Sequence, residues 1–214
     1  MGDYAISVQD VRKSFGQEEI LHGIAVDFEA GKTHGIVGFN GSGKTVLFKC
    51  ICGFLEPTSG RVFVGGKEIG KDIDFPESLG LIIENPGFLQ NMSGFKNLRL
   101  LAQLNRKISD EVIKDTIRKV GLDPDMKKPV AKYSLGMRQR LGIAQAIMED
   151  PDILILDEPF NGLDKKGVSE IHQLIRDLKA KGKTIILTSH NAVDIDTLAD
   201  DVWEMDAGKL ERIK

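Results

Sequence analysis

The sequence is poor in cysteine and has no excess of positive charge. Its two cysteines, Cys50 and Cys52, are one residue apart, a spacing that suits neither a disulfide nor a zinc site. We expect them to be small core residues of a chain kept in a reducing compartment. The net charge of −3 indicates no polyanion-binding surface, so we expect no nucleic-acid partner.

Long apolar runs and a leader sequence are also missing. No window approaches the roughly 18 continuous apolar residues of a spanning helix, and the N-terminus has neither the basic nor the apolar region of a signal peptide. We therefore expect a cytoplasmic chain that neither spans a membrane nor is secreted. The hydrophobic content of 41% is nevertheless sufficient for a substantial core.

The most specific local pattern is GFNGSGKT, which fits G-x-x-x-x-G-K-[ST] at every fixed position. A short β-branched run at 33–37 precedes it, and residues 46–51 suit a buried helix, so the pattern lies in the strand–loop–helix context that a phosphate-binding loop requires. An ordinary Gly-rich turn is the alternative. In the functional interpretation Lys44 reaches the β- and γ-phosphates and Thr45 binds Mg²⁺. The candidate nucleotide-binding residues of this loop are Gly38, Phe39, Asn40, Gly41, Ser42, Gly43, Lys44 and Thr45.

The order of expected elements predicts an α/β fold. Strands dominate the first third, helical periodicity without strand signal runs over 93–148, and a clean alternation follows, which is typical of parallel strands with crossover helices. The alternating elements are strands at 153–156, 184–187 and 202–205 and helices at 165–181 and 191–199. We predict a single domain over residues 1–214. It is a P-loop NTPase fold with a mostly parallel sheet core, an N-terminal antiparallel β-subdomain and a helical insertion over about residues 86–150.

Two carboxylates follow the apolar run at 153–156, where open α/β sheets bind their ligands. Asp157 is placed to hold Mg²⁺, as in other P-loop NTPases. Glu158 is a candidate general base for an attacking water. A solvated strand end would explain the pair alone, because acidic residues are common in turns. The phosphate loop makes the catalytic interpretation the more specific one.

Five segments in a fixed order resemble an ATP-binding-cassette (ABC) transporter ATPase. They are GFNGSGKT, YSLGMRQR at 133–140, ILILDEP at 153–159, NGLD at 161–164 and the strand-end His190. The resemblance covers essentially the whole chain. The family pattern LSGGQ is modified here, because Leu135 replaces a glycine and Met137 the glutamine, while Ser134 and Gly136 are retained.

The resemblance implies a head-to-tail dimer with two ATP molecules between the subunits. Each site would combine one phosphate loop with Ser134 and Gly136 of the partner, whose helix start forms a second anion-binding end. Phe15 lies where the family stacks an aromatic ring on adenine, although it could equally be a core residue, and the 161–164 segment would communicate between the sites. The candidate catalytic residues are Lys44, Glu158 and His190.

Glu84 departs from the family pattern, which usually has a glutamine that touches Mg²⁺ and the attacking water. A carboxylate there could bind metal more strongly yet repel phosphate. The alternative is that Glu84 is a solvated turn residue and Asn85 makes the contact. The candidate metal ligands are therefore Thr45, Asp157 and Glu84. The segments IIENPGF and YSLGM resemble the bacitracin and lantibiotic exporter branch.

The function that these residues favour is a Mg²⁺-dependent ATPase, with ATP and Mg²⁺ as its ligands. Because we find no spanning segment, we expect it to power a separate transmembrane permease, as a homodimer or with a related ABC subunit, at the inner face of the membrane. A soluble ABC-fold machine not coupled to transport is the alternative. A GTPase is not supported, because the guanine-specifying N-K-x-D is missing from the sequence.

Overall fold

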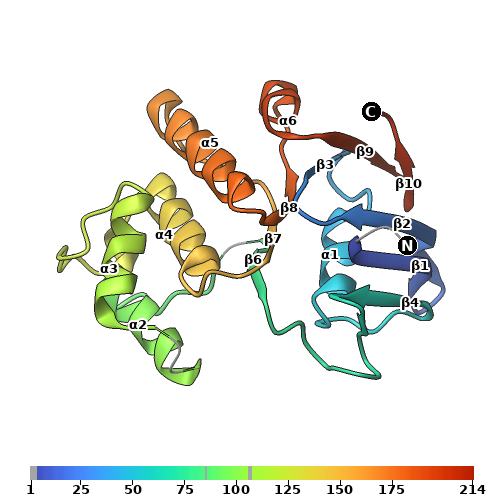
Figure 1. Cartoon of the computed structure of the whole chain (residues 1–214), viewed down its shortest axis with the longest axis horizontal. Helices are drawn as coiled ribbons and strands as arrows, with labels where there is room; N and C mark the ends of the chain where they lie inside the picture. The colour runs from blue at the N-terminus through green and yellow to red at the C-terminus, as the bar shows by residue number, and fades with distance from the viewer. Residues whose placement is uncertain (1–3, 85, 106–107) are drawn as a thin grey trace.

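Two β-sheets and a group of helices make up the computed structural model, which describes residues 4–84, 86–105 and 108–214. A six-stranded sheet runs through the centre, a four-stranded sheet lies to one side, and the helices α2, α3 and α4 lie to the other (Figure 1). The four-stranded sheet has the order β2-β1-β4-β5 and the central sheet the order β10-β9-β3-β8-β7-β6.

Neighbouring strands of the four-stranded sheet pair in the antiparallel sense, β1 with β2, β1 with β4 and β4 with β5. Both of its hairpins have two-residue connections, since Phe15 pairs with Glu18 and Val64 with Lys67. Each connection contains glycine with positive φ, which two-residue hairpins favour. The predicted N-terminal antiparallel β-subdomain is therefore confirmed. The strands are β1 (Tyr4–Phe15), β2 (Glu18–Glu29), β4 (Ser59–Val64) and β5 (Lys67–Glu68).

The central sheet is parallel except at one edge, where β10 pairs with β9 in the antiparallel sense. Its middle strands are buried on both faces and consist of apolar and β-branched residues, as parallel strands between helical layers require. The strands are β3 (Thr33–Val37), β6 (Leu79–Ile82), β7 (Ile153–Leu156), β8 (Thr184–Thr188), β9 (Asp201–Asp206) and β10 (Lys209–Arg212), and the crossover helices are α5 (Lys165–Ala180) and α6 (Ala192–Leu198). The β10 strand was not predicted from the sequence.

The chain between β6 and β7 contains only helices in the part that the structure describes. The elements are α2 (Gly94–Asn105), α3 (Asp110–Lys119), a 3-10 turn (Val130–Lys132) and α4 (Leu135–Ile147). Ser109 and Ser134 cap α3 and α4 by accepting hydrogen bonds from backbone N–H groups in the first turn. The predicted helical insertion is confirmed.

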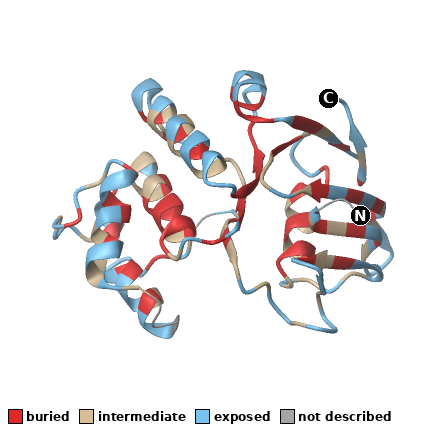
Figure 2. Cartoon of the chain, in the orientation of Figure 1, coloured by how far each residue is buried: buried red, intermediate tan, exposed pale blue. Residues whose placement is uncertain are grey.

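Two hydrophobic cores lie on opposite faces of the central sheet. Buried positions accordingly occur in the central strands and in the elements on both sides of them (Figure 2). Alternate residues of one strand face different cores, since Leu154 belongs to the core with α4 and α5, whereas Ile155 packs toward α1 (Lys44–Ile51) and the antiparallel sheet. Cys50 and Cys52 are buried in the second core as free thiols, and burial raises their pKa values to about 11 and about 12. The prediction of small core cysteines is confirmed.

The fold brings the carboxyl ends of β3, β7 and β8 to one edge of the sheet, next to the start of α1. Ligands of open α/β sheets bind at this edge. Within the described ranges, no helix has both the length and the apolar character to cross a bilayer.

Candidate functional site

The phosphate loop follows β3 and turns sharply into α1. Gly38 and Gly43 have φ values of 145° and 112°, a region that favours glycine because it has no Cβ. A Cβ at Gly38 would also lie 2.2 Å from the carbonyl oxygen of Met205. The sequence therefore needs glycine at Gly38 for two independent reasons. The turn leads into the start of α1, where free backbone N–H groups can bind an anion.

Lys44 is the first residue of α1, and its side chain folds back over the loop. Its ammonium group donates to the carbonyl oxygens of Gly38 at 2.7 Å and Phe39 at 2.9 Å. The residue is 8% exposed, and burial lowers the pKa of Lys44, with Asp157 and Glu158 opposing that shift. Because its hydrogen bonds go to neutral carbonyl groups, the buried Lys44 ammonium group can exchange these partners for phosphate oxygens.

Asp157 lies at the end of β7 between two hydroxyl groups from different elements. Its Oδ1 accepts a hydrogen bond of 2.8 Å from Thr188 of β8, and its Oδ2 lies 3.4 Å from the hydroxyl of Thr45 on α1. The Thr188 hydroxyl also accepts from the backbone N–H of Glu158 at 2.8 Å. One threonine thus fixes the position of Asp157 and the backbone of Glu158.

Glu158 faces His190, which follows the neighbouring strand β8. Its Oε2 accepts from the backbone N–H of His190 at 3.2 Å, and its Oε1 lies 3.3 Å from His190 Nε2. Burial raises the pKa of Glu158, while the charge and backbone N–H of His190 oppose the shift. The backbone of Glu158 has a φ of 51°, a conformation that costs a non-glycine residue energy and that recurs at functional sites.

A pocket of about 380 Å³ brings most of the predicted site residues together. Phe15 stands at its wall, 51% exposed, with the ammonium group of Lys13 lying 5.2 Å from its ring centroid. This leaves an aromatic face available for a base. The pocket is lined by Phe15, Ile20, Asn40, Gly41, Gly43, Lys44, Thr45, Val46, Asp157, Glu158 and His190.

Two buried oxygen atoms in this region lack a hydrogen-bond partner among the described residues. They are Ser42 Oγ in the phosphate loop and Glu158 Oε1, whose contact with the His190 ring does not have hydrogen-bond geometry. A buried polar atom without a partner is costly unless a ligand satisfies it. Of the two residues, only Glu158 lines the pocket, where its Oε1 suits a water molecule. Together with the phosphate loop beside it, this site fits a nucleoside triphosphate.

The described residues contain no group of three or more histidine, cysteine, aspartate or glutamate side chains that could enclose a metal ion. Thr45 and Asp157 supply two oxygen ligands close together. Mg²⁺ is commonly bound through one or two protein oxygens together with substrate phosphates. This donor set therefore fits Mg²⁺ delivered with a nucleotide.

Ser134 and Gly136 lie at the start of α4 and do not line this pocket. The Ser134 hydroxyl accepts from Met137 N at 3.2 Å, and a Cβ at Gly136 would lie 2.6 Å from the carbonyl oxygen of Gly162. Leu135 between them is 52% exposed. The start of α4 is therefore a capped, accessible helix terminus that contacts the 161–164 loop.

Glu84 lies outside the pocket, in an ion pair with Lys49 of α1 at 2.8 Å. Its φ is 58°, and its side chain is 61% exposed. Its role as a metal ligand stays a prediction. The alternative contact through Asn85 lies outside the described residues.

Three polar groups near the site were not identified from the sequence. They are the side chains of Thr188, Ser189 and Asp194. Their contacts join β7, β8, α5 and α6, and only the run Thr188-Ser189 directly before His190 could have drawn attention to them.

The family described as ABC transporter matches residues 21–161. The chain is 45% identical over 206 residues to an uncharacterized ABC transporter ATP-binding protein, YybJ, of Bacillus subtilis (strain 168), covering 96% of this chain and 94% of that protein. It is 39% identical over 210 residues to the bacitracin transport ATP-binding protein BcrA of Enterococcus faecalis, covering 97% of this chain and 68% of BcrA.

A solved structure of similar fold is the dimeric post-hydrolysis state of the ATP-binding cassette MJ0796 bound to ADP and Pi. The TM-score is 0.86, the sequence identity is 20%, and the match covers 98% of this chain and 99% of that chain. At this identity the likeness shows the fold alone.

Proposed function

Because this chain belongs to the ABC transporter family, we propose that it is the ATP-hydrolysing subunit that powers a separate transmembrane permease of an exporter. The relative BcrA is named as a bacitracin transport protein, which supports export. The alternative, a soluble ABC-fold machine not coupled to transport, is not favoured, because both relatives named above are described as transport proteins.

One observation carries the catalytic part of the proposal, namely the pocket that joins Phe15, Lys44, Thr45, Glu158 and His190. ATP bound there would place adenine against Phe15 and its phosphates on the loop. The β- and γ-phosphates would displace the two carbonyl oxygens that the Lys44 ammonium group now contacts. The exchange is favourable, because a phosphate oxygen carries a negative charge that attracts the ammonium group more strongly than a neutral carbonyl oxygen does.

Hydrolysis then follows from the position of Glu158. Its Oε1 would accept a proton from water as the water oxygen attacks the γ-phosphorus and the bond to the ADP oxygen breaks. His190 lies 3.3 Å from this oxygen and would steady the water and the γ-phosphate. Lys44 would stabilise charge that develops on the phosphate oxygens.

The cofactor proposed for this site is Mg²⁺. Thr45 and Asp157 would hold it, and Glu84 would join them only after leaving Lys49. When bound, Mg²⁺ neutralises charge on the β- and γ-phosphates. Thr188 keeps the Asp157 carboxylate in place through its 2.8 Å hydrogen bond.

The composite site needs a second subunit, either another copy of this chain or a related ABC subunit. Ser134 and Gly136 do not line the pocket of their own chain, and the exposed start of α4 is free to contact the ATP of a partner. The backbone N–H groups there and the positive end of the helix dipole suit a γ-phosphate. We place the assembly at the cytoplasmic face of the membrane, with residues 1–214 as one nucleotide-binding domain and its helical subdomain over about 86–150.

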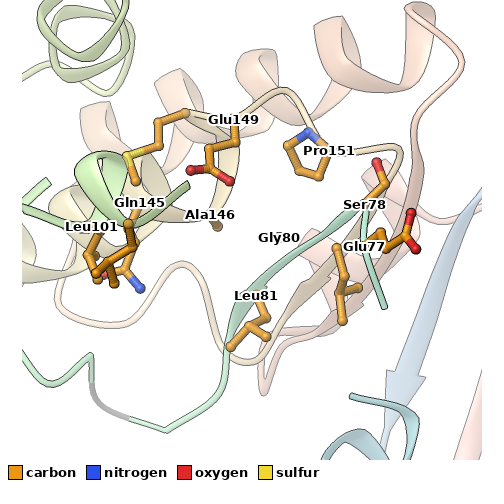
Figure 3. A pocket seen from close by; sticks show the side chains of 12 residues that line it. Glu77, Ser78, Gly80, Leu81, Leu101, Gln145, Ala146, Glu149 and Pro151 are labelled. Carbon is orange, nitrogen blue, oxygen red and sulfur yellow. The ribbon is translucent and has the colours of Figure 1, made fainter. Parts of the chain in front are cut away.

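The permease would bind at a cleft of about 440 Å³ on the helical insertion. Figure 3 shows this cleft between β6, which carries Gly80 and Leu81, and the α2 and α4 region, which carries Leu101 and Gln145. Leu104 at its rim is 80% exposed. The cleft contacts both the strand that leads to Glu84 and the helix that begins at Ser134, so a permease helix seated there could move both.

Purification with and without the permease tests the proposal. The chain should hydrolyse ATP and co-purify with a polytopic membrane protein. Leu104→Glu should weaken that association and leave ATP affinity unchanged, whereas the control Val112→Glu, on an exposed position of α3, should do neither. Recovery with a soluble partner or nucleic acid instead would favour the alternative function.

A further inference from the structure

A buried carboxylate outside the nucleotide pocket joins the two strand-end segments that carry Glu158 and His190. Asp194 lies in α6 and is 3% exposed. It does not cap that helix, because the side chain of Asn191 accepts the hydrogen bond from Val193 N. The Asp194 side chain therefore has another role, which its partners define.

The first partner of Asp194 is Ser189, at the end of β8. The Ser189 hydroxyl donates to Asp194 Oδ2 at 2.8 Å and accepts from the backbone N–H of Asn191 at 3.1 Å. These two bonds fold residues 189–191 around the Ser189 side chain. Since both the backbone N–H and the ring of His190 face Glu158, the conformation of this short segment sets both contacts.

The second partner of Asp194 is His172, on α5. Its Nε2 donates to Asp194 Oδ1 at 2.9 Å, and the other side of the ring meets Phe160 edge-on with ring centroids 4.9 Å apart. Phe160 is 8% exposed and follows Glu158 by two residues. The single carboxylate of Asp194 is thus connected to the His190 segment through a serine and to the Glu158 segment through a histidine.

The hydrogen bonds of Asp194 with Ser189 and His172 are strong enough to hold the two strand-end segments in one arrangement. Both bonds go to a carboxylate, and such bonds are shorter and about twice as strong as neutral ones. The site is removed from water, which strengthens them further. Loss of one partner would leave a buried donor or acceptor without its bond, so the network holds one arrangement and disfavours others.

We propose that Asp194 is a positioning residue for ATP hydrolysis, which acts through Ser189 and His172 to hold His190 and Glu158 in the arrangement that activates water. The inference rests on the roles proposed above for Glu158 and His190. A displacement of about 1 Å in a catalytic group lowers a rate by up to about 100-fold. Asp194 therefore controls turnover without touching nucleotide.

The principal test compares Asp194→Asn with Asp201→Asn in the full chain. Asp201 forms the other buried histidine–aspartate pair, 2.6 Å from His34 and at the far end of β9, so its replacement controls for lost stability. Asp194→Asn should lower kcat about 10- to 100-fold and change KM for ATP by less than about twofold. Asp201→Asn should lower Tm comparably and leave kcat unchanged.

A second readout needs neither nucleotide nor turnover. The chain has four histidines, so the ring resonances in a histidine-labelled NMR spectrum can be assigned by single substitutions. Asp194→Asn should shift the His190 and His172 resonances, whereas Asp201→Asn should shift that of His34 alone. Ser189→Ala, which removes only a hydroxyl, should shift His190 in the same direction and serves as the test variant if Asp194→Asn fails to fold.

The outcomes separate this inference from the proposed function. If Glu158→Gln abolishes turnover while Asp194→Asn and Ser189→Ala have the wild-type kcat and His190 resonance, Asp194 is structural only and the inference is wrong. Full turnover in Glu158→Gln would overturn the proposed function itself. A reduced kcat with a shifted His190 resonance and an unchanged KM supports the positioning role.

Discussion

The ammonium group of Lys49 lies 2.8 Å from the carboxylate of Glu84, so the helix that begins at the phosphate loop is joined to the segment that leaves β6. The two side chains are 35% and 61% exposed. An ion pair this accessible is worth only about 0–1 kcal/mol, because water screens it and both side chains lose freedom. The Lys49–Glu84 ion pair can therefore break at little cost when a metal ion and phosphate bind nearby.

The Lys49–Glu84 pair predicts different results for its two partners. Glu84→Gln should leave ATP affinity nearly unchanged but alter permease-stimulated hydrolysis, because it removes a negative charge near the proposed metal ion. Lys49→Gln breaks the same ion pair and keeps that charge. Steady-state ATPase rates with and without permease distinguish them, and identical rates in both variants would show that only the ion pair matters.

Glu158→Gln should lower kcat by about 10²- to 10⁴-fold, because the side chain can no longer accept a proton. ATP affinity should persist, and an ATP-bound dimer should accumulate in light-scattering measurements. The matched control is Glu204→Gln, an exposed residue on β9, which should have the wild-type rate. Undiminished hydrolysis in Glu158→Gln would remove Glu158 from the mechanism.

The pKa of Glu158 predicts how stability depends on pH. Burial raises this pKa in the folded chain, so the folded state binds a proton more readily than the unfolded state, and stability falls as pH rises from the ordinary pKa of glutamate through the folded value. Glu158→Gln should therefore be more stable than wild type at neutral pH. In a pH series, the Tm difference between Glu158→Gln and wild type should become smaller as the solution becomes more acidic. The acid limit of turnover should likewise lie above the ordinary glutamate range.

Stacking on Phe15 should contribute weakly to nucleotide affinity and should depend little on which base is bound. Aromatic pairs are worth about 0.5–1.5 kcal/mol beyond area burial, which corresponds to a roughly 2- to 12-fold loss of ATP affinity in Phe15→Ala. Phe15→Tyr should bind normally. Phe54 is 56% exposed and lies outside the pocket, so Phe54→Ala is the control for calorimetric binding of ATP and GTP.

Ser134 and Ser109 offer a comparison between two helix caps. Each accepts a hydrogen bond from the first turn of its helix, so alanine at either position should cost about 1 kcal/mol of stability. Only Ser134→Ala should also impair ATP-driven dimerisation, measured by size-exclusion chromatography of a Glu158→Gln background. Equal dimerisation of both variants would mean that Ser134 is no more than a cap.

The fold could be predicted largely from local sequence patterns. The phosphate loop, the apolar strand before Asp157 and the capping serine of α4 each have a short-range signal, and the ABC resemblance, the ATPase assignment and the α/β fold are confirmed. The β10 strand was missed, because a short, exposed edge strand with alternating charges resembles a tail.

The contacts around the site could not be predicted, because they depend on pairing between distant segments. Lys49 and Glu84 are 35 residues apart, and Thr188 reaches Glu158 across 30 residues. No periodicity in the sequence states which strands are neighbours or which rotamer a side chain adopts. Asp194 was missed for the same reason, since an aspartate near the start of a helix ordinarily suggests only a favourable charge.

The buried thiols of Cys50, in α1, and Cys52, directly after it, can report when this helix separates from the core. Thiols with pKa values of about 11 and about 12 react slowly, because only the thiolate attacks an alkylating reagent. Modification at neutral pH would therefore count excursions in which α1 leaves the core. A slower alkylation of these thiols in the presence of nucleotide would measure, without any introduced label, how much a bound ligand stabilises the packing of α1 against the sheet.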